Sequence, residues 1–154
     1  MSRGIRCALS SIRVYTDLSR PGGRSILVGY VAELITPERR VMGLVGRQNL
    51  DPEEMSEIHG LLRHRVSALW DFLSSEFELA CGVEPGRGLE YLASRHSFAF
   101  SFEAPEPVKI PKSLTDAIHA DKEKLEREFR SFLSKQAEED LIQHESGIKF
   151  KIAA

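Results

Sequence analysis

The chain has 154 residues, of which 42% are hydrophobic and 29% are charged, and its formal net charge is −2. This length and balance indicate one globular domain with its own core and exclude a chain that is disordered along its body. The small net charge creates no overall field that would recruit nucleic acid or an acidic membrane. No stretch is long and apolar enough to span a bilayer, so no membrane partner is expected.

The two cysteines, Cys7 and Cys81, do not have the spacing of a metal site, and a core of this size does not need a disulfide. The N-terminal residues lack the long apolar run of a signal peptide. We therefore expect a cytoplasmic protein with reduced cysteines, and a disulfide stays open as the alternative.

Three strands are predicted in the first third of the chain, after a flexible arm over residues 1–9 that precedes a single domain over 10–154. Residues 11–18 alternate apolar and polar side chains, as a strand with one buried face does. Residues 25–34 are nearly all apolar, which predicts a central strand covered on both faces. A third strand is predicted over 40–46, and the short connections favour an antiparallel meander.

A long helix is predicted to begin at Asp51 and to run to about Ala80. Asp51 can cap exposed backbone donors, Pro52 suits the first helical position, and Glu54 completes a capping box. Apolar residues recur at helical spacing along this stretch, and glycine and proline then stop it. Residues 82–94 are expected to contain at most a short helical turn.

The second half of the chain predicts a strand, a helix and a final strand. Residues 96–103 form a strand with phenylalanines on one face, and the prolines of 104–111 indicate an extended linker. A second helix begins at Ser113, with Asp116 as its reciprocal cap. The alternation over 148–152 predicts a short last strand. The fold class is therefore α+β: a three-stranded antiparallel meander, a long helix, a strand, a second helix and a short final strand.

The first strand ends on Tyr15-Thr16-Asp17 and leads into a turn that contains glycine. Together with the order of elements, this stretch resembles the ribonuclease H-like family, whose helices pack on a mixed sheet. The resemblance implies an acidic residue at this strand end, a second carboxylate near the start of the first helix and a third after the fourth strand. Those positions match Asp17, Glu54 or Glu57, and Glu103.

The resemblance implies metal-dependent cleavage of nucleic-acid phosphodiesters. Asp17, Glu54 and Glu103 would be the catalytic residues, and with Glu57 they would be the ligands of Mg²⁺ or Mn²⁺. Such cations take oxygen ligands from several elements, activate water and stabilise the leaving oxygen. Glu54 lies nearer the apolar stripe of its helix than Glu57 and is preferred, although the capping box explains it without any metal.

Basic residues cluster at the two turns of the predicted meander. Arg20 and Arg24 lie in the first turn, and Arg39 and Arg40 lie at the second. Arginine can hold phosphate through two hydrogen bonds, so these four are the candidate nucleic-acid contacts. The alternative is that they only solubilise the surface.

Two functional hypotheses follow. The first is a small ribonuclease H-like domain, active or degenerate, and the incomplete motif favours a degenerate one. The second is a non-enzymatic protein–protein interaction module or small regulatory protein, which binds a partner or a second copy through a sheet face or the charged second helix. The first requires the carboxylates to converge around a cleft, and the second requires an exposed apolar patch or an unpaired sheet edge.

Overall fold

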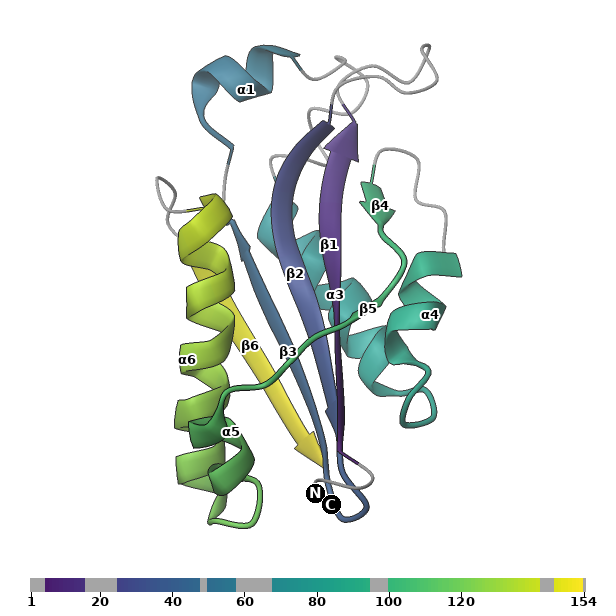
Figure 1. Ribbon diagram of the computed structural model, residues 1–154. Coiled ribbons are helices and arrows are strands. Elements are labelled where there is room, and N and C mark those ends of the chain that lie inside the picture. The colour runs from purple at the N-terminus through teal and green to yellow at the C-terminus, as the bar shows by residue number, and fades with distance from the viewer. Residues whose placement is uncertain are drawn as a thin grey trace.

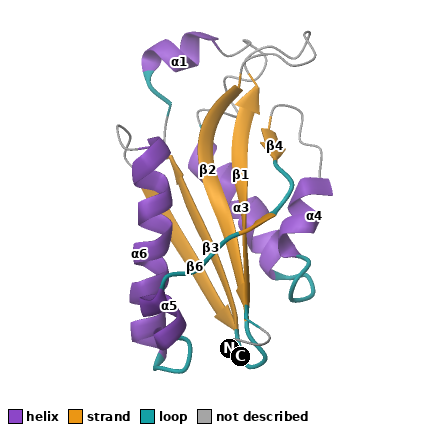
Figure 2. Ribbon diagram, viewed as in Figure 1, coloured by secondary structure: helices purple, strands orange, loops and turns teal. Residues whose placement is uncertain are grey.

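A computed structural model shows an α+β fold in which one antiparallel sheet lies between helices on both of its faces (Figure 1). Strands occupy the middle layer, and the helices lie to either side of it (Figure 2). The predicted fold class is confirmed. The structure describes residues 5–15, 25–47, 50–57, 68–94, 100–141 and 146–153.

The predicted meander is formed by β1 (Arg6–Tyr15), β2 (Ser25–Ile35) and β3 (Arg40–Arg47). Successive strands pair antiparallel, and β2 lies between β1 and β3, as its apolar sequence predicted. β1 begins earlier than expected, so residues 6–9, which were assigned to a flexible arm, are paired in the sheet. The alternating side chains of this segment, including a buried Cys7, explain the pairing, because they give it one face toward each core.

Three further strands complete the sheet. β4 (Phe100–Phe102) and β5 (Glu106–Pro107) pair with β1, and β6 (Ser146–Ala153) pairs with β3. The order is β4-β1-β2-β3-β6, with β5 beside β1. Every pairing among the described strands is antiparallel, whereas the ribonuclease H-like alternative would have a mixed sheet.

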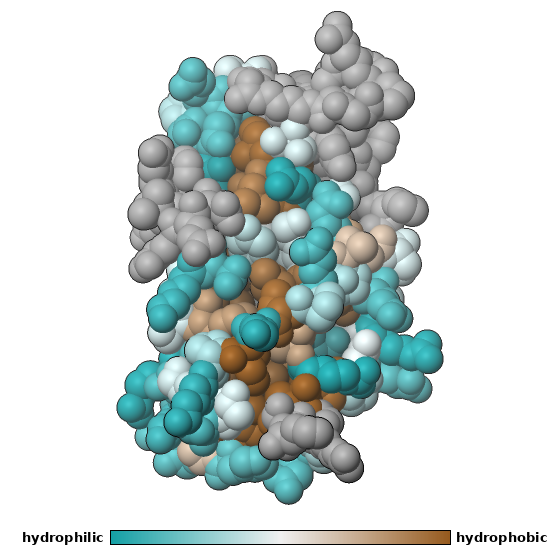
Figure 3. Space-filling view, in the orientation of Figure 1, coloured by the Kyte–Doolittle hydropathy of each residue, from teal (hydrophilic) through white to brown (hydrophobic). Residues whose placement is uncertain are grey.

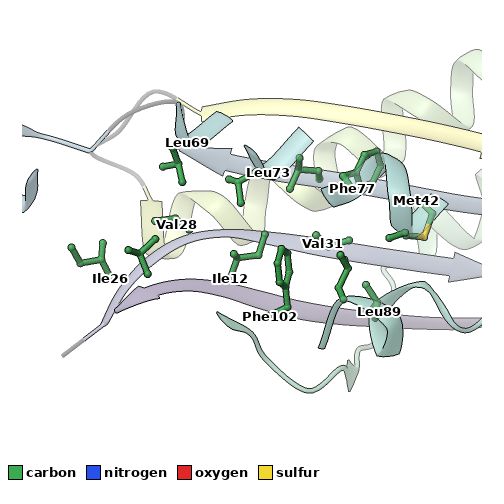
Figure 4. Close-up of a cluster of buried hydrophobic side chains, with 14 of the residues drawn as sticks. Ile12, Ile26, Val28, Val31, Met42, Leu69, Leu73, Phe77, Leu89 and Phe102 are labelled. Atoms are coloured by element: carbon green, nitrogen blue, oxygen red, sulfur yellow. The ribbon is translucent and has the colours of Figure 1, made fainter. Parts of the chain in front are cut away.

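One face of the sheet carries α3 (Leu69–Cys81) and α4 (Gly88–Ser94), and α1 (Pro52–Glu57) lies beyond the end of β3. The long helix predicted from Asp51 to Ala80 thus corresponds to α1 and α3, and residues 58–67 between them lie outside the described residues. The inward side chains of α3 and α4 meet those of the strands in one buried cluster, which includes Ile12, Val31, Met42, Leu73, Phe77, Leu89 and Phe102 (Figure 4).

The other face carries α5 (Lys112–Ala117) and α6 (Lys122–Leu141), where a single helix from Ser113 was expected. Asp116 was predicted to cap that helix, but Asp121 caps α6 instead, because its Oδ1 accepts the Lys124 N–H at 2.8 Å. An N-cap residue itself has non-helical backbone angles, so a capping residue at position 121 interrupts the helix and divides the segment in two. None of the described helices is long and apolar enough to cross a membrane.

Helix α6 approaches the sheet closely over Gly43 of β3. A Cβ at this glycine would lie 2.5 Å from side-chain atoms of both Leu133 and Phe129. The missing side chain therefore admits the apolar stripe of α6, which forms a second buried cluster with the strands. That cluster includes Ala32, Leu34, Val41, Val45, Leu125, Phe129 and Leu133.

Candidate functional sites

The predicted acidic site can be placed only in part. Asp17 lies outside the described residues, as does the side chain of Glu57 at the end of α1. Glu54 and Glu103 are described. The metal site therefore stays a prediction with respect to Asp17 and Glu57, and the positions of the other two carboxylates can be compared.

Glu54 is held by the start of its own helix and by β3. Its N–H donates to Asp51 Oδ1 at 2.8 Å, and its Oε1 accepts the Asp51 N–H at 3.2 Å, so the predicted capping box is confirmed. Arg47, which is only 2% exposed, also donates to both carboxylate oxygens of Glu54, with Nη1 2.9 Å from Oε2. Glu54 thus anchors α1 to the end of β3.

Glu103 follows β4 on the far side of the sheet. Its N–H donates to the Ser11 carbonyl at 2.9 Å. Ser11 lies four residues, or about 13 Å, along β1 from Tyr15, which is the last described residue before Asp17. β4 and β3 are separated by β1 and β2, which corresponds to about 14 Å across the sheet. The structure therefore does not bring Glu54 and Glu103 to one cation. Within the described residues, no group of three His, Cys, Asp or Glu side chains could hold a metal ion.

The four arginines that were predicted to bind phosphate lie in different environments. Arg20 and Arg24 lie outside the described residues. Arg39 is half-buried, and its Nη1 donates to the Ala120 carbonyl at 3.0 Å, so it joins β3 to the start of α6. Arg40 is buried, and its guanidinium points into the protein rather than toward a surface that nucleic acid could reach.

Arg40 forms a buried ion pair with Glu33 of the adjacent strand, with Nε 2.8 Å from Oε2. The same guanidinium donates to the carbonyls of Ala80, Cys81 and Val83, at and just beyond the C-terminus of α3, at distances of 2.7 to 3.2 Å. The last carbonyls of a helix lack partners within the helix, and a cation there also opposes the negative end of the dipole. The pair therefore fastens α3 to the sheet.

Sequence reasoning missed this pair, although one signal for it exists. Glu33 is the one charged residue in the apolar run Ile26–Leu34, which was predicted to be buried on both faces. A carboxylate in such a position requires a cationic partner, because an unpaired buried charge costs several kcal/mol. The adjacent arginines at the start of the next strand were the nearest candidates.

A cavity of about 400 Å³ lies beside this pair, in the size range of small-molecule sites. Glu33 and Gly86 lie on its wall, and the Gly86 N–H donates to Glu33 Oε2 at 3.1 Å. Gly86 has a φ of +89°, which favours glycine and leaves the wall without a side chain at this point. Most of the other lining residues are apolar: Ile5, Cys7, Ala8, Ile35, Leu89, Pro105, Pro107 and Val108, with Arg6 and Glu90 also present.

Both cysteines are free thiols. Burial raises the pKa of the Cys7 thiol to about 12, and the negative charge of Glu33 acts in the same direction. Burial likewise raises the pKa of Cys81 to about 11, and the charge of Glu78 adds to this effect. Thiols that resist ionisation are poor nucleophiles, so neither cysteine has the character of a catalytic residue.

The outer edge of β6 is a second candidate site, in addition to the cavity beside Glu33. No other described strand pairs with it, since β6 ends the sheet. Lys149 and Lys151 lie opposite Leu44 and Met42 of β3, and therefore on the face that carries α3. Both lysines approach the single carboxylate of Glu78, at 3.2 and 3.9 Å.

The opposite face, over which α6 lies, also has an apolar surface. Apolar side chains gather along the middle of this face in Figure 3. Several residues pack against the core there while keeping some exposure, among them Leu9, Leu27, Val108 and Ile110. An interaction module requires an apolar patch or an open strand edge, and the described residues provide both.

Two candidate sites thus remain in the described part of the chain: the cavity beside Glu33 and the edge of β6. Neither contains a predicted metal ligand. Comparisons of the chain with protein-family models, curated proteins and solved structures found no match.

Proposed function

We propose that this chain is a non-enzymatic interaction module that binds a partner protein by adding an extended segment of that partner to β6. The observation that carries the proposal is the open outer edge of this strand, which no described strand covers. Such an edge presents unpaired N–H and C=O groups at alternate residues, and another strand can pair with them.

The charges along β6 select the occupant. Lys149 and Lys151 share one carboxylate, that of Glu78, so this cluster of three side chains carries one net positive charge. Directly opposite residues of paired strands lie on the same face, and opposite charges there stabilise the pairing. Acidic side chains at alternate positions of the added strand would therefore lie beside the two lysines.

The other face of β6 is apolar. Ile148, Phe150 and Ile152 are partly buried against the core beneath α6, and the ring of Phe150 lies 5.8 Å from that of Phe129. An added strand would extend this layer if its remaining side chains were apolar. The partner segment is therefore one in which acidic and apolar residues alternate.

A second copy of the chain fits this edge poorly. In a two-fold antiparallel pairing of β6 with itself that is centred on Phe150, Lys149 of each copy would lie directly opposite Lys151 of the other. Like charges in directly opposite positions destabilise a sheet. Lysine on an edge strand is also a recognised protection against self-pairing.

The experiment is a fluorescence anisotropy titration of the protein with a short labelled peptide in which glutamate and valine alternate. The test variant carries Lys149→Glu and Lys151→Glu, which reverse both charges at exposed positions of β6. The control carries Lys122→Glu and Lys124→Glu on the exposed surface of α6 and makes the same change in net charge. A second peptide, with lysine in place of glutamate, tests the charge preference.

We expect the glutamate peptide to bind the wild type and the control, and the β6 variant to lose at least about tenfold in affinity. Binding that is equal in both variants, or equal for the two peptides, would overturn the proposal. So would the absence of binding to the wild type. A β6-dependent dimer in sedimentation velocity would show that a second copy, and not an acidic segment, occupies the edge.

A further inference from the structure

The cavity beside Glu33 contains a hydrogen-bond acceptor that the fold does not use. Glu33 is only 4% exposed and lies on the cavity wall. Its Oε2 accepts from both Arg40 and Gly86. Its Oε1 accepts no hydrogen bond from any described residue. Glu33 Oε1 is not among the fully enclosed polar atoms that lack a partner, so it keeps surface that a ligand can reach. A donor placed in the cavity would therefore find an open acceptor in largely apolar surroundings.

The charge around this acceptor is already balanced. The carboxylate of Glu33 is neutralised by the guanidinium of Arg40, which is itself buried. The two other charged residues that line the cavity, Arg6 and Glu90, are exposed and of opposite sign. A ligand that brought its own charge would leave that charge uncompensated in a largely apolar space, which is unfavourable. An uncharged donor fits better than an ammonium or a carboxylate.

The remaining walls favour an apolar body. Ile35 lies against Gly86, since a Cβ on that glycine would be 3.4 Å from Ile35 Cδ1. Leu89 of α4 and the prolines Pro105 and Pro107 line the cavity as well. These side chains have no hydrogen-bonding groups to satisfy, so the polar requirement of the cavity is concentrated at Glu33.

From this arrangement we infer that the cavity is a binding site for a small, uncharged, apolar molecule with one N–H or O–H donor, which is directed at Glu33 Oε1. This site is separate from the edge of β6. It uses β1, β2, β5 and α4, and none of its lining residues belongs to the strand proposed to bind a partner. Its test can therefore succeed or fail independently of the proposed function.

The experiment compares two probes of nearly the same shape, indole and benzofuran, which differ in whether the ring carries an N–H donor. Each is titrated into ¹⁵N-labelled protein, and the amide of Gly86 is the reporter because it donates to the same carboxylate. Phenethylamine, which is cationic, tests the charge rule, which is that the cavity prefers an uncharged donor to an ammonium. The affinity of indole is expected to exceed that of benzofuran by at least about tenfold.

Two alanines provide matched variants in which neither member of the buried ion pair is replaced. Ala8→Leu adds side-chain volume to the cavity wall. Ala104→Leu makes the same change at an exposed residue beside the wall that is not part of it. We expect the first to abolish the indole-dependent shift of Gly86 and the second to preserve it.

Several results would overturn the inference. One is equal affinity for indole and benzofuran, and another is indole binding that Ala8→Leu does not weaken. Tighter binding of phenethylamine than of indole would refute the charge rule, and hence the ligand class. If indole does not bind the wild type, the cavity is not a site of this kind.

Discussion

Replacing Arg40 by methionine should cost a large part of the stability of the fold. The substitution keeps an unbranched side chain but removes the guanidinium that pairs with Glu33 and donates to three carbonyls around the end of α3. Removing one partner of a buried pair typically costs about 3–5 kcal/mol. The free energy of unfolding of a whole domain is about 5–15 kcal/mol, so the variant should be barely stable enough to fold.

A double variant separates the cost of the unpaired buried charge from the rest of the stability that Arg40→Met loses. Arg40→Met combined with Glu33→Leu leaves no buried charge without its partner, and such apolar replacements are often neutral. The carbonyls at the end of α3 still lose their donors, so stability should not return fully. We expect the double variant to be about 2 kcal/mol more stable than Arg40→Met alone.

Urea unfolding followed by circular dichroism measures both free energies, provided that the m values agree among the variants. Arg87→Met is the control, because the side chain of Arg87 is 72% exposed and its loss should change stability by about 0.5 kcal/mol at most. The reasoning fails if Arg40→Met costs less than about 1 kcal/mol. It also fails if the double variant is no more stable than Arg40→Met alone.

Three further outcomes are expected. Gly43→Ala should lower the melting temperature and cost about 1–3 kcal/mol, because its Cβ would overlap side chains of α6, and an unchanged melting temperature would contradict that contact. Glu54→Gln should cost about 1–3 kcal/mol in urea unfolding, and Glu103→Gln under about 0.5 kcal/mol, whereas equal costs would deny Glu54 its anchoring role. The thiol of Cys7 ionises near pH 9 in the unfolded chain and only near pH 12 in the fold, so the unfolded state binds fewer protons between these values. Stability should therefore fall there by up to about 1.4 kcal/mol per pH unit, and Cys7→Ala should show a shallower decline; identical pH profiles would refute the shift.

Local rules predicted those parts of the fold that local interactions stabilise. The capping box of Asp51 and Glu54 was correctly assigned, because its partners lie three residues apart and their hydrogen bonds require only the first turn of a helix. The meander was also predicted, since short turns between apolar runs leave few other pairings. The split between α5 and α6 was missed because Asp116 and Asp121 are both plausible caps, and the choice between them depends on how each helix packs.

The candidate sites could be predicted much less well. The resemblance placed Glu54 and Glu103 in one cluster, but the path of the chain puts two strands between their elements. Arg40 was counted as a surface cation because the sequence does not show that α3 ends above it. The cavity beside Glu33 likewise depends on β1, β5 and α4, which come from distant parts of the chain. Such features arise from tertiary contacts, which periodicity and composition do not encode.

The position of β6 has a consequence for how the protein folds. It pairs Arg40 with Ala153 and Arg47 with Ser146, so the register of this ladder joins residues separated by most of the chain. Closing so long a loop loses chain entropy before any stabilising contact forms. This pairing should therefore form slowly compared with the meander. Until the last strand arrives, the apolar strand β3 has a bare edge. During synthesis and refolding, that edge is where chaperone binding and misassembly should concentrate.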